Sequence, residues 1–140
     1  MPNNPTSSLT KRDFQQLSQF RYQLRCFLRH SENICREHGM TSLQYQLLLH
    51  LQGFEGQEWA TVGQLAERLQ AKHHGTVTLI DRCEQLGLVE RRPGREDRRQ
   101  IEVHLLTEGA KRVAQIAEMH QPELRQLQEE IRLPDWEGRV

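Results

Sequence analysis

The sequence predicts a mostly α-helical fold that carries one small β-hairpin. Apolar residues recur every three or four positions over most of the chain, and capping residues and glycines divide this pattern into helices. One stretch of alternating apolar and polar residues surrounds a Pro-Gly turn, as in a hairpin. A length of 140 residues suits one domain with a modest core, so residues 1–140 are interpreted as a single domain.

Composition limits the class of protein. With 19 basic and 19 acidic residues the net charge is zero, which excludes a general coat of positive charge but not a local basic patch. No apolar run approaches the ~18 residues that a membrane span requires. The amino-terminal MPNNPTSSLTKRD is polar and lacks the apolar core of a signal peptide, and residues 1–8 read as a frayed tail. We therefore expect a cytoplasmic protein with no membrane partner.

The first two helices follow from apolar spacing and from glycines that end helices. A long helix is expected within residues 9–38, stopped by Gly39, and a second between a cap at Thr41 or Ser42 and Gly53. The apolar residues of the long helix are Phe14, Leu17, Phe20, Leu24, Phe27, Leu28, Ile34 and Cys35, and those of the second are Leu43, Leu47, Leu48 and Leu51.

Two shorter helices come next and form a helix-turn-helix. The stretch GFEGQEWA is expected to be a loop that leads to a capping box, in which the Thr61 hydroxyl and the Gln64 amide each bond a backbone N–H at the helix start. After the turn QAKH, a further helix runs from about His73 to Gln85 and ends at Gly87. Two helices joined by so short a turn are typical of a helix-turn-helix.

A β-hairpin is expected directly after the helix-turn-helix. The stretches LVERR and RQIEVHLL alternate apolar and polar residues across the loop PGRED. The segment RRPGREDRR, residues 91–99, gathers five arginines around the turn. A solvated loop would explain such charge, but the position of the loop favours the basic tip of a wing, a hairpin that touches a polyanion. Residues 41–106 are therefore interpreted as a winged DNA-binding region.

The last part of the chain is expected to be helical again. Thr107 can cap it, and Pro122 should kink it or divide it in two. The amphipathic helices within residues 9–38 and 107–133 carry longer apolar stripes than residues 41–106 can cover, and such stripes are usually buried across a dimer. The predicted fold is therefore mostly α with a small β-wing, a winged helix-turn-helix flanked by terminal dimerisation helices.

The motifs in this order resemble the MarR family of bacterial transcription regulators. LAERL resembles the third helix of that family, and VTLIDRCEQLGLVERR its recognition helix and first wing strand. DRR matches the Asp-x-Arg element of the wing, and LLTEGA resembles the Leu-Thr and glycine element after it. The resemblance extends from about Leu17 to Leu127. It implies a homodimer that binds a pseudo-palindromic operator in double-stranded DNA.

Physical reasons assign roles within the predicted recognition helix. One side gathers Thr76, Leu79, Ile80, Cys83 and Leu86, with Val77 at its edge. The opposite side is polar, and the amino-terminal part of such a helix reaches base edges in the major groove. His73, His74 and Thr78 can hydrogen-bond bases, and Gly75 permits close approach. Lys72, with the free amides of the helix start, suits phosphates, as does Arg82 at the flank.

The wing residues take their expected roles from the resemblance. Arg99 matches the arginine of the family that enters the minor groove, where a narrow groove concentrates negative potential. Asp97 is expected to orient that arginine by an ion pair, since a carboxylate would be repelled by DNA. Arg95 and Arg98 are candidates for phosphate contacts or for a second insertion into the groove. Arg91 and Arg92 lie on the strand and are expected to face the DNA backbone or to be structural.

Two departures from the family concern the recognition helix. Cys83 stands where the family mostly has leucine, so this thiol is expected to belong to the core. His73, His74 and Gly75 stand where small hydroxyl residues are common, so the base preferences of the family do not transfer.

Redox and metal sensing remain as alternatives of the same fold. Cys26, Cys35 and Cys83 match no metal spacing, and the peroxide branch of the family places its reactive cysteine near the position of Leu17. The adjacent His73 and His74 cannot easily reach one metal ion from a helix, and the other histidines form no tight cluster with cysteines or acids. We therefore expect no metal and no cofactor.

A small ligand is the expected effector. Family ligands are often aromatic acids or phenols bound between the dimer module and the winged helix, where Phe20, Leu24, Tyr45 and Trp59 are candidate lining residues, or else core residues. A repressor relieved by such an inducer is the leading hypothesis. A winged helix that binds only proteins would not call for the wing arginines. No nucleophile–base pair, phosphate-binding glycine loop or carboxylate pair indicates an enzyme.

Overall fold

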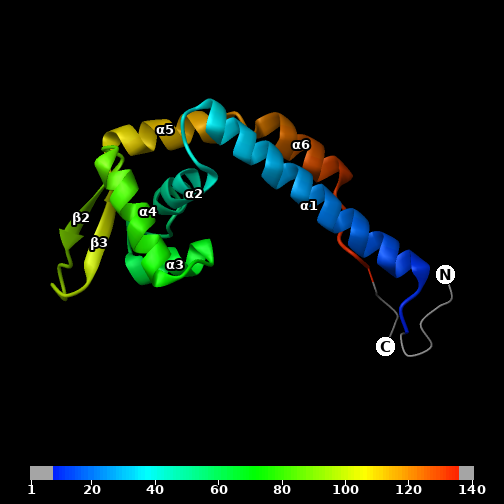
Figure 1. The fold of residues 1–140 in the computed structure, drawn as a ribbon, viewed down its shortest axis with the longest axis horizontal. Helices are drawn as coiled ribbons and strands as arrows, with labels where there is room; N and C mark the ends of the chain where they lie inside the picture. Colours follow the sequence, from blue (N-terminus) through cyan, green and yellow to red (C-terminus); the bar gives the residue numbers. More distant parts are fainter. Residues whose placement is uncertain (1–7, 136–140) are drawn as a thin grey trace. The chain divides into compact units, whose positions relative to one another are not determined.

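The computed structural model describes residues 8–135 and confirms the predicted fold class, a mostly helical chain with a small antiparallel sheet (Figure 1). Most of the expected amino-terminal tail lies outside these residues. The elements are α1 (Lys11–Glu37), α2 (Ser42–Gln52), β1 (Trp59–Thr61), α3 (Val62–Leu69), α4 (His73–Gln85), β2 (Val89–Pro93), β3 (Ile101–Leu105), α5 (Thr107–Glu118) and α6 (Gln121–Glu130). They form two compact units, one of residues 32–119 and one that joins residues 8–31 to 120–135.

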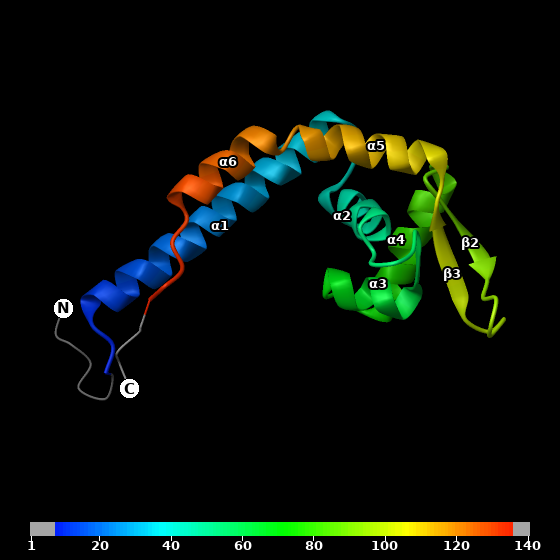
Figure 2. The same cartoon turned by 180° about the vertical axis from the view of Figure 1, so that it is seen from behind.

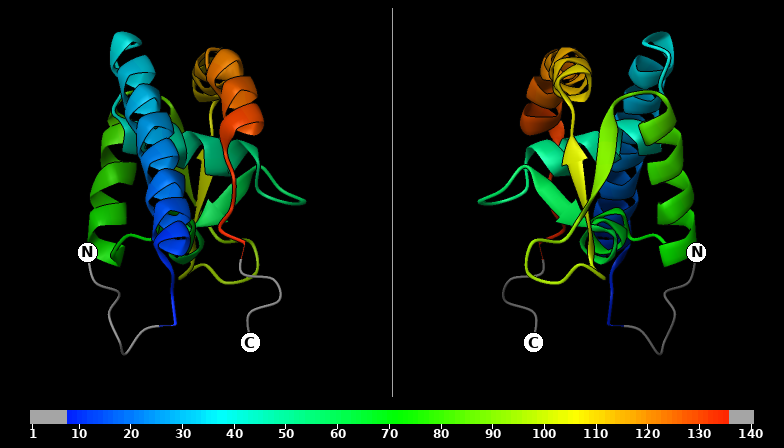
Figure 3. Two further views of the ribbon diagram at one scale, coloured as in Figure 1. Left: turned by 90° about the vertical axis from the view of Figure 1, so that its right-hand side faces the viewer. Right: turned by 90° about the vertical axis from the view of Figure 1, so that its left-hand side faces the viewer.

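The sheet belongs to the unit of residues 32–119 and has the strand order β1-β3-β2. Strands β2 and β3 are the hairpin that the alternation predicts. Strand β1 corrects the expectation of a loop over GFEGQEWA, because Trp59 and Ala60 pair with His104 and Val103 of β3 (Figure 3). Strand β3 also begins later than expected, at Ile101, since the segment before it forms the turn of the wing. A strand of three residues is too short for alternation to reveal it.

The core of this unit is apolar and lies where α2, α3 and α4 pack against one another and against the sheet (Figure 2). Its fully buried side chains include Leu47, Leu48, Leu51, Leu65, Ile80, Cys83, Val103 and Ile116. The helical spacing predicts most of them. Leu43 is the exception in α2: it lies on the predicted stripe but is half exposed.

Side-chain caps fix the starts of two of the helices. The Thr41 hydroxyl accepts from the Gln44 N–H at 3.1 Å, and the Gln44 side chain accepts from the Thr41 N–H at 3.0 Å, so Thr41 rather than Ser42 is the cap of α2. The same reciprocal pair joins Thr61 and Gln64 at α3, as the sequence predicts. Thr107 is not a cap: it is the first residue of α5, which starts without a side-chain cap bond.

In the second unit α1 and α6 lie side by side (Figures 1 and 2). The Ser31 hydroxyl lies 2.7 Å from His120 Nε2, and Gln23 Nε2 donates to the Glu130 carbonyl at 2.9 Å. Pro122 divides the last helical region in two, which is one of the two outcomes predicted for it. It lies in the first turn of α6, where an N–H would have no partner inside the helix, so the missing N–H costs no hydrogen bond. Within residues 8–135 no helix is long and apolar enough to span a membrane.

Candidate nucleic-acid interface

Helices α3 and α4 are joined by a turn of residues 70–72. Gln70 holds the turn in the left-handed region with φ of 52°, and its side-chain amide donates to the Glu67 carbonyl at 2.8 Å. The Ala71 N–H closes the turn on the Ala66 carbonyl at 3.0 Å. A left-handed residue other than glycine is uncommon, and here backbone and side-chain bonds together hold it. The turn therefore sets the direction in which α4 leaves α3.

Helix α4 separates a buried face from a polar one, as the sequence predicts. Thr76, Ile80 and Cys83 are buried, and the Thr76 hydroxyl donates to the Lys72 carbonyl at 2.9 Å. The candidate DNA-contacting residues of this helix and its start are all exposed. They are Lys72, His73, His74, Gly75, Thr78 and Arg82.

The start of α4 keeps its donors available. Its N-cap residue, Lys72, makes no side-chain hydrogen bond to the helix within the described part of the chain. The first N–H groups of a helix lack partners inside the helix, and the helix dipole adds partial positive charge there. The Thr78 hydroxyl donates to the His74 carbonyl at 3.1 Å, so its oxygen is left to accept a hydrogen bond. This end of α4 can therefore bind phosphate and read base edges.

Arg91 joins α4 to β2 and neutralises two acids of α4. Its guanidinium lies 2.5 Å from Asp81 and 2.8 Å from Glu84, and its backbone N–H donates to the Glu84 carboxylate at 2.9 Å. Without this partner, both carboxylates would oppose binding of a polyanion. Arg91 is thus structural, one of the two roles expected for it. Arg92 pairs with Glu90 and contacts His104.

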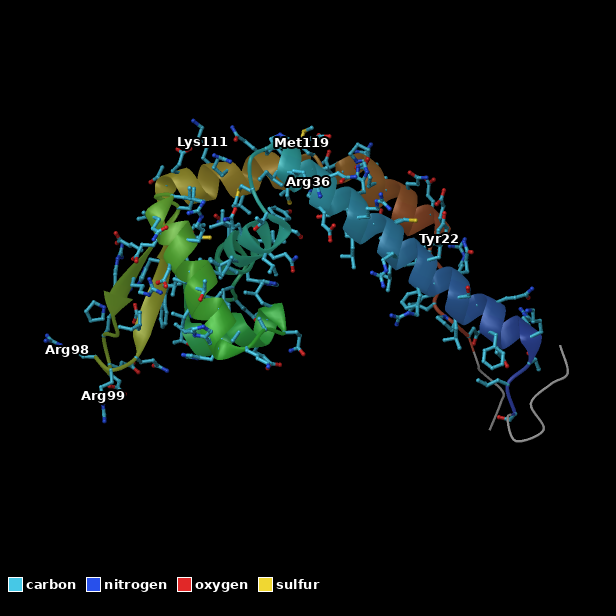
Figure 4. All side chains as sticks on the ribbon, viewed as in Figure 1. Tyr22, Arg36, Arg98, Arg99, Lys111 and Met119 are labelled. Atoms are coloured by element: carbon cyan, nitrogen blue, oxygen red, sulfur yellow. The ribbon has the colours of Figure 1, made fainter. Side chains whose placement is uncertain are left out.

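The tip of the wing is a tight turn that presents arginines. The Gly94 N–H donates to the Gln100 carbonyl at 2.8 Å, and a Cβ on Gly94 would lie 2.3 Å from the Asp97 carbonyl oxygen, so a side chain does not fit there. The Asp97 carboxylate accepts from the Arg99 N–H at 3.0 Å and lies 3.5 Å from its Nε. The Arg99 side chain is 95% exposed, and Arg98 and Arg99 project away from the tip (Figure 4).

Sequence reasoning missed a buried polar pair at the base of the wing. Glu102 and His104 share one face of β3, and both are buried. The alternation of IEVHL leads one to expect polar residues on the solvent side. The signal for burial is the aromatic Trp59, whose ring stacks on His104. Trp59 lies opposite His104 in strand β1, which the sequence does not predict.

The four candidate ligand-lining residues lie in different surroundings. Phe20 and Leu24 belong to α1 within residues 8–31. Tyr45 is part of the core of the other unit, and the Trp59 ring stacks on His104 with centroids 6.1 Å apart. Their shared role in binding a ligand stays a prediction.

None of the three cysteines forms a disulfide, and two of them, Cys35 and Cys83, are buried. Burial raises the pKa of Cys83 to about 11, which keeps this thiol protonated and unreactive at neutral pH. Cys83 therefore belongs to the core, as expected, and only Cys26 is exposed. Within residues 8–135 no three histidine, cysteine or acidic side chains group in a way that could hold a metal ion.

Oxidation is expected to leave DNA binding unchanged. Cys35 and Cys83 should resist iodoacetamide in the native protein and react only on unfolding, because the reagent cannot reach them. A variant with all three cysteines changed to serine should bind the same DNA as the wild type, with some loss of stability from the hydroxyl at position 83. Mass spectrometry and a gel-shift assay with and without peroxide check this. Peroxide-dependent release that disappears in the serine variant would contradict it.

Comparison with known proteins assigns the family. The sequence model of the MarR family matches residues 38–100. The uncharacterized HTH-type transcriptional regulator YsmB of Bacillus subtilis (strain 168) is 32% identical over 106 residues, which cover 71% of this chain and 72% of YsmB. The chain belongs to the MarR family. It is a DNA-binding transcription regulator and not an enzyme.

Solved structures agree with this assignment. The MarR family regulator AbsC from Streptomyces coelicolor is 23% identical, with a TM-score of 0.76 over 86% of this chain and 81% of AbsC. A MarR family protein from Bacillus stearothermophilus is 25% identical, with a TM-score of 0.73 over 89% of this chain and 86% of that one.

Two further structures of this fold hold bound molecules. One is a mutant of MepR from S. aureus bound to an oligodeoxyribonucleotide, 20% identical with a TM-score of 0.62 over 81% of both chains. The other is NadR in complex with 4-hydroxyphenylacetate, 18% identical with a TM-score of 0.69 over 92% of this chain and 85% of NadR. At these identities the likeness is one of fold.

Proposed function

We propose that this MarR family protein is a cytoplasmic homodimer that binds a pseudo-palindromic operator and represses transcription until a small aromatic or phenolic ligand releases it. The DNA-binding part rests on one observation: the start of α4 is polar and exposed, and the tip of the wing presents an exposed arginine as well. The oligonucleotide bound to MepR, a protein of the same fold, supports it.

The proposed contacts divide into two kinds. His73, His74 and Thr78 read base edges in the major groove, and Gly75 lets the helix approach the DNA closely. The phosphate and wing contacts come from basic side chains, which are Lys72, Arg82, Arg95, Arg98 and Arg99. Asp97 holds Arg99 in place for the minor groove, since it already contacts both the backbone N–H and the guanidinium of that residue.

The ligand response is tested separately from DNA binding. NadR, which has this fold, binds 4-hydroxyphenylacetate, a phenolic acid. We infer that a ligand of the same chemical class acts on this protein. Titration with phenolic acids should weaken operator binding, whereas aliphatic acids of equal charge should not. Equal effects of both kinds would mean that salt alone releases the DNA.

The terminal helices are expected to form the dimer. Phe14, Leu28 and Leu124 of α1 and α6 are 50%, 53% and 43% exposed in the single chain, although helices of this kind bury their apolar stripes. Leu28→Glu should therefore turn a dimer into a monomer in light scattering at micromolar concentration. Leu86→Glu is a matched control, because Leu86 is 47% exposed but belongs to the end of α4 and not to the terminal helices. A wild-type monomer would contradict the proposal.

One experiment tests the operator. The pure protein selects duplexes from a random pool, and the selected DNA is sequenced. A two-fold protein imposes two-fold symmetry on its site, so two inverted half-sites about one helical turn apart are expected. A single unrepeated motif would contradict the dimeric mode of binding.

A further inference from the structure

The buried pair Glu102 and His104 has no place in the DNA contacts proposed above. Glu102 is 5% exposed and His104 8%, on the face of β3 that meets Trp59 and Arg92. His104 Nε2 lies 2.9 Å from Glu102 Oε1, and His104 Nδ1 lies 3.3 Å from the Arg92 guanidinium. Both contacts fit the tautomer that carries its hydrogen on Nε2. The Trp59 ring stacks on the imidazole and holds it in place.

The other oxygen of Glu102 reaches the wing. Glu102 Oε2 accepts from the backbone N–H of Arg95 at 3.3 Å, and Oε1 lies 3.8 Å from Arg95 Nε. Arg95 stands directly after Gly94, where the chain leaves β2, and its side chain is 73% exposed. The carboxylate therefore links the rigid sheet to the loop that carries Asp97, Arg98 and Arg99.

Packing alone does not explain a carboxylate at this place. An apolar residue on β3 would fill the same space without the cost of removing a charge from water. The hydrogen bond from His104, with the N–H and charge of Arg95, offsets that cost and lowers the pKa of Glu102. The carboxylate therefore stays ionised at neutral pH and keeps accepting from the loop.

We propose that Glu102 is a positioning residue for DNA binding, which holds the wing loop through Arg95 so that Arg98 and Arg99 meet the DNA in one orientation. The inference rests on the proposed role of the wing. Glu102 itself touches no DNA. Its contribution is to fix the loop before binding, so that less loop entropy is lost in the complex. Arg95 thus has a role through its backbone N–H besides any contact of its side chain with phosphate.

The test is Glu102→Gln, which keeps the size of the side chain but removes its charge. The variant should bind the selected operator about five- to tenfold more weakly, a loss of the size of one ordinary hydrogen bond, because the amide oxygen can still accept from the loop but lacks the charge. In the Arg99→Ala background the same change should cost less, because one of the two arginines that Glu102 positions is gone. Hydrogen exchange should also be faster at the Arg95 amide in Glu102→Gln. Glu55→Gln is the matched control, because it removes a carboxylate charge at an exposed position outside the hairpin, and it should leave both measurements unchanged.

Each outcome decides a different point. If Arg99→Ala weakens binding but Glu102→Gln does not, the positioning role is wrong and the wing keeps its function. If Glu102→Gln costs as much with Arg99 as without it, its effect is general destabilisation, and the inference fails. If Arg99→Ala binds as wild type, the proposed role of the wing fails, whereas the exchange rate of the Arg95 amide still reports whether Glu102 holds the loop. Glu102→Asp, which withdraws the carboxylate by one methylene, should be intermediate and serves if the glutamine variant does not fold.

Discussion

Gly109→Ala is expected to lower the free energy of unfolding by about 3 kcal/mol, because a side chain does not fit at this position. A Cβ on Gly109 would lie 2.2 Å from the Leu88 carbonyl oxygen and 2.8 Å from Leu105 Cδ1. The Leu88 carbonyl also accepts from the Leu106 N–H at 3.0 Å, so moving it away would break the bond that fixes the entry into α5. Gly109 therefore lets α5 pack directly against the segment that starts the wing.

Gly75→Ala is the matched control and should have the opposite effect on stability. Gly75 lies in the first turn of α4, where an added Cβ meets no atom within 4 Å. Alanine there should raise the free energy of unfolding by about 0.5–1 kcal/mol, because it restricts the unfolded chain and favours the helix. The same variant should weaken operator binding if the helix approaches DNA at this point.

Urea unfolding of both variants measures the stabilities. One protein concentration is used for both, since the proposed dimerisation would make the stabilities depend on concentration. Equal stability of Gly109→Ala and wild type would mean that the segment around Leu88 yields to the added methyl group. A stabilised Gly75→Ala that binds the operator as well as wild type would remove Gly75 from the proposed interface.

Local rules predicted much of the fold because each acts within a few residues. The cap at Thr41, one of the two predicted for α2, and the box Thr61–Gln64 fix helix starts by bonds between residues three apart, and Pro122 acts through its own missing N–H. The two faces of α4 follow from the helical period alone. These features require no knowledge of the rest of the chain.

The remaining features depend on residues that are distant in the sequence. Strand β1 exists because Ala60 pairs with Val103, and three residues carry too little pattern to predict that pairing. The burial of Glu102 and His104 follows from the same strand, since Trp59 covers His104. Leu43 shows the opposite case: it continues the apolar stripe of α2 but is left half exposed by residues 8–135. In the candidate interface, the two faces of α4 were therefore predictable except for Leu86, which was expected on the apolar side but is 47% exposed. The support of the wing was not predictable.

Arg99→Ala and His74→Ala are expected to weaken DNA binding in different ways. The Arg99 side chain is 95% exposed at the tip of the wing. In the proposed complex it brings positive charge into the minor groove, where it recognises the width of the groove and not a pattern of hydrogen bonds. Its loss should weaken binding to many sequences and reduce the slope of log affinity against log salt by about 1. His74 is a candidate base contact. Its loss should relax the preference at one position per half-site and cost on the order of 1–3 kcal/mol on the best sequence.

Asp97→Ala separates orientation from charge at the same tip. The carboxylate accepts from the Arg99 N–H at 3.0 Å and lies 3.5 Å from its Nε, so this change removes the orientation of the arginine but keeps its charge. Its effect should be a milder form of the Arg99→Ala effect. Each variant is titrated against the selected operator and its single-base variants across a salt series. Wild-type binding by Arg99→Ala, or an unchanged base preference in His74→Ala, would show that the roles within the winged helix are assigned wrongly, although the family would stand.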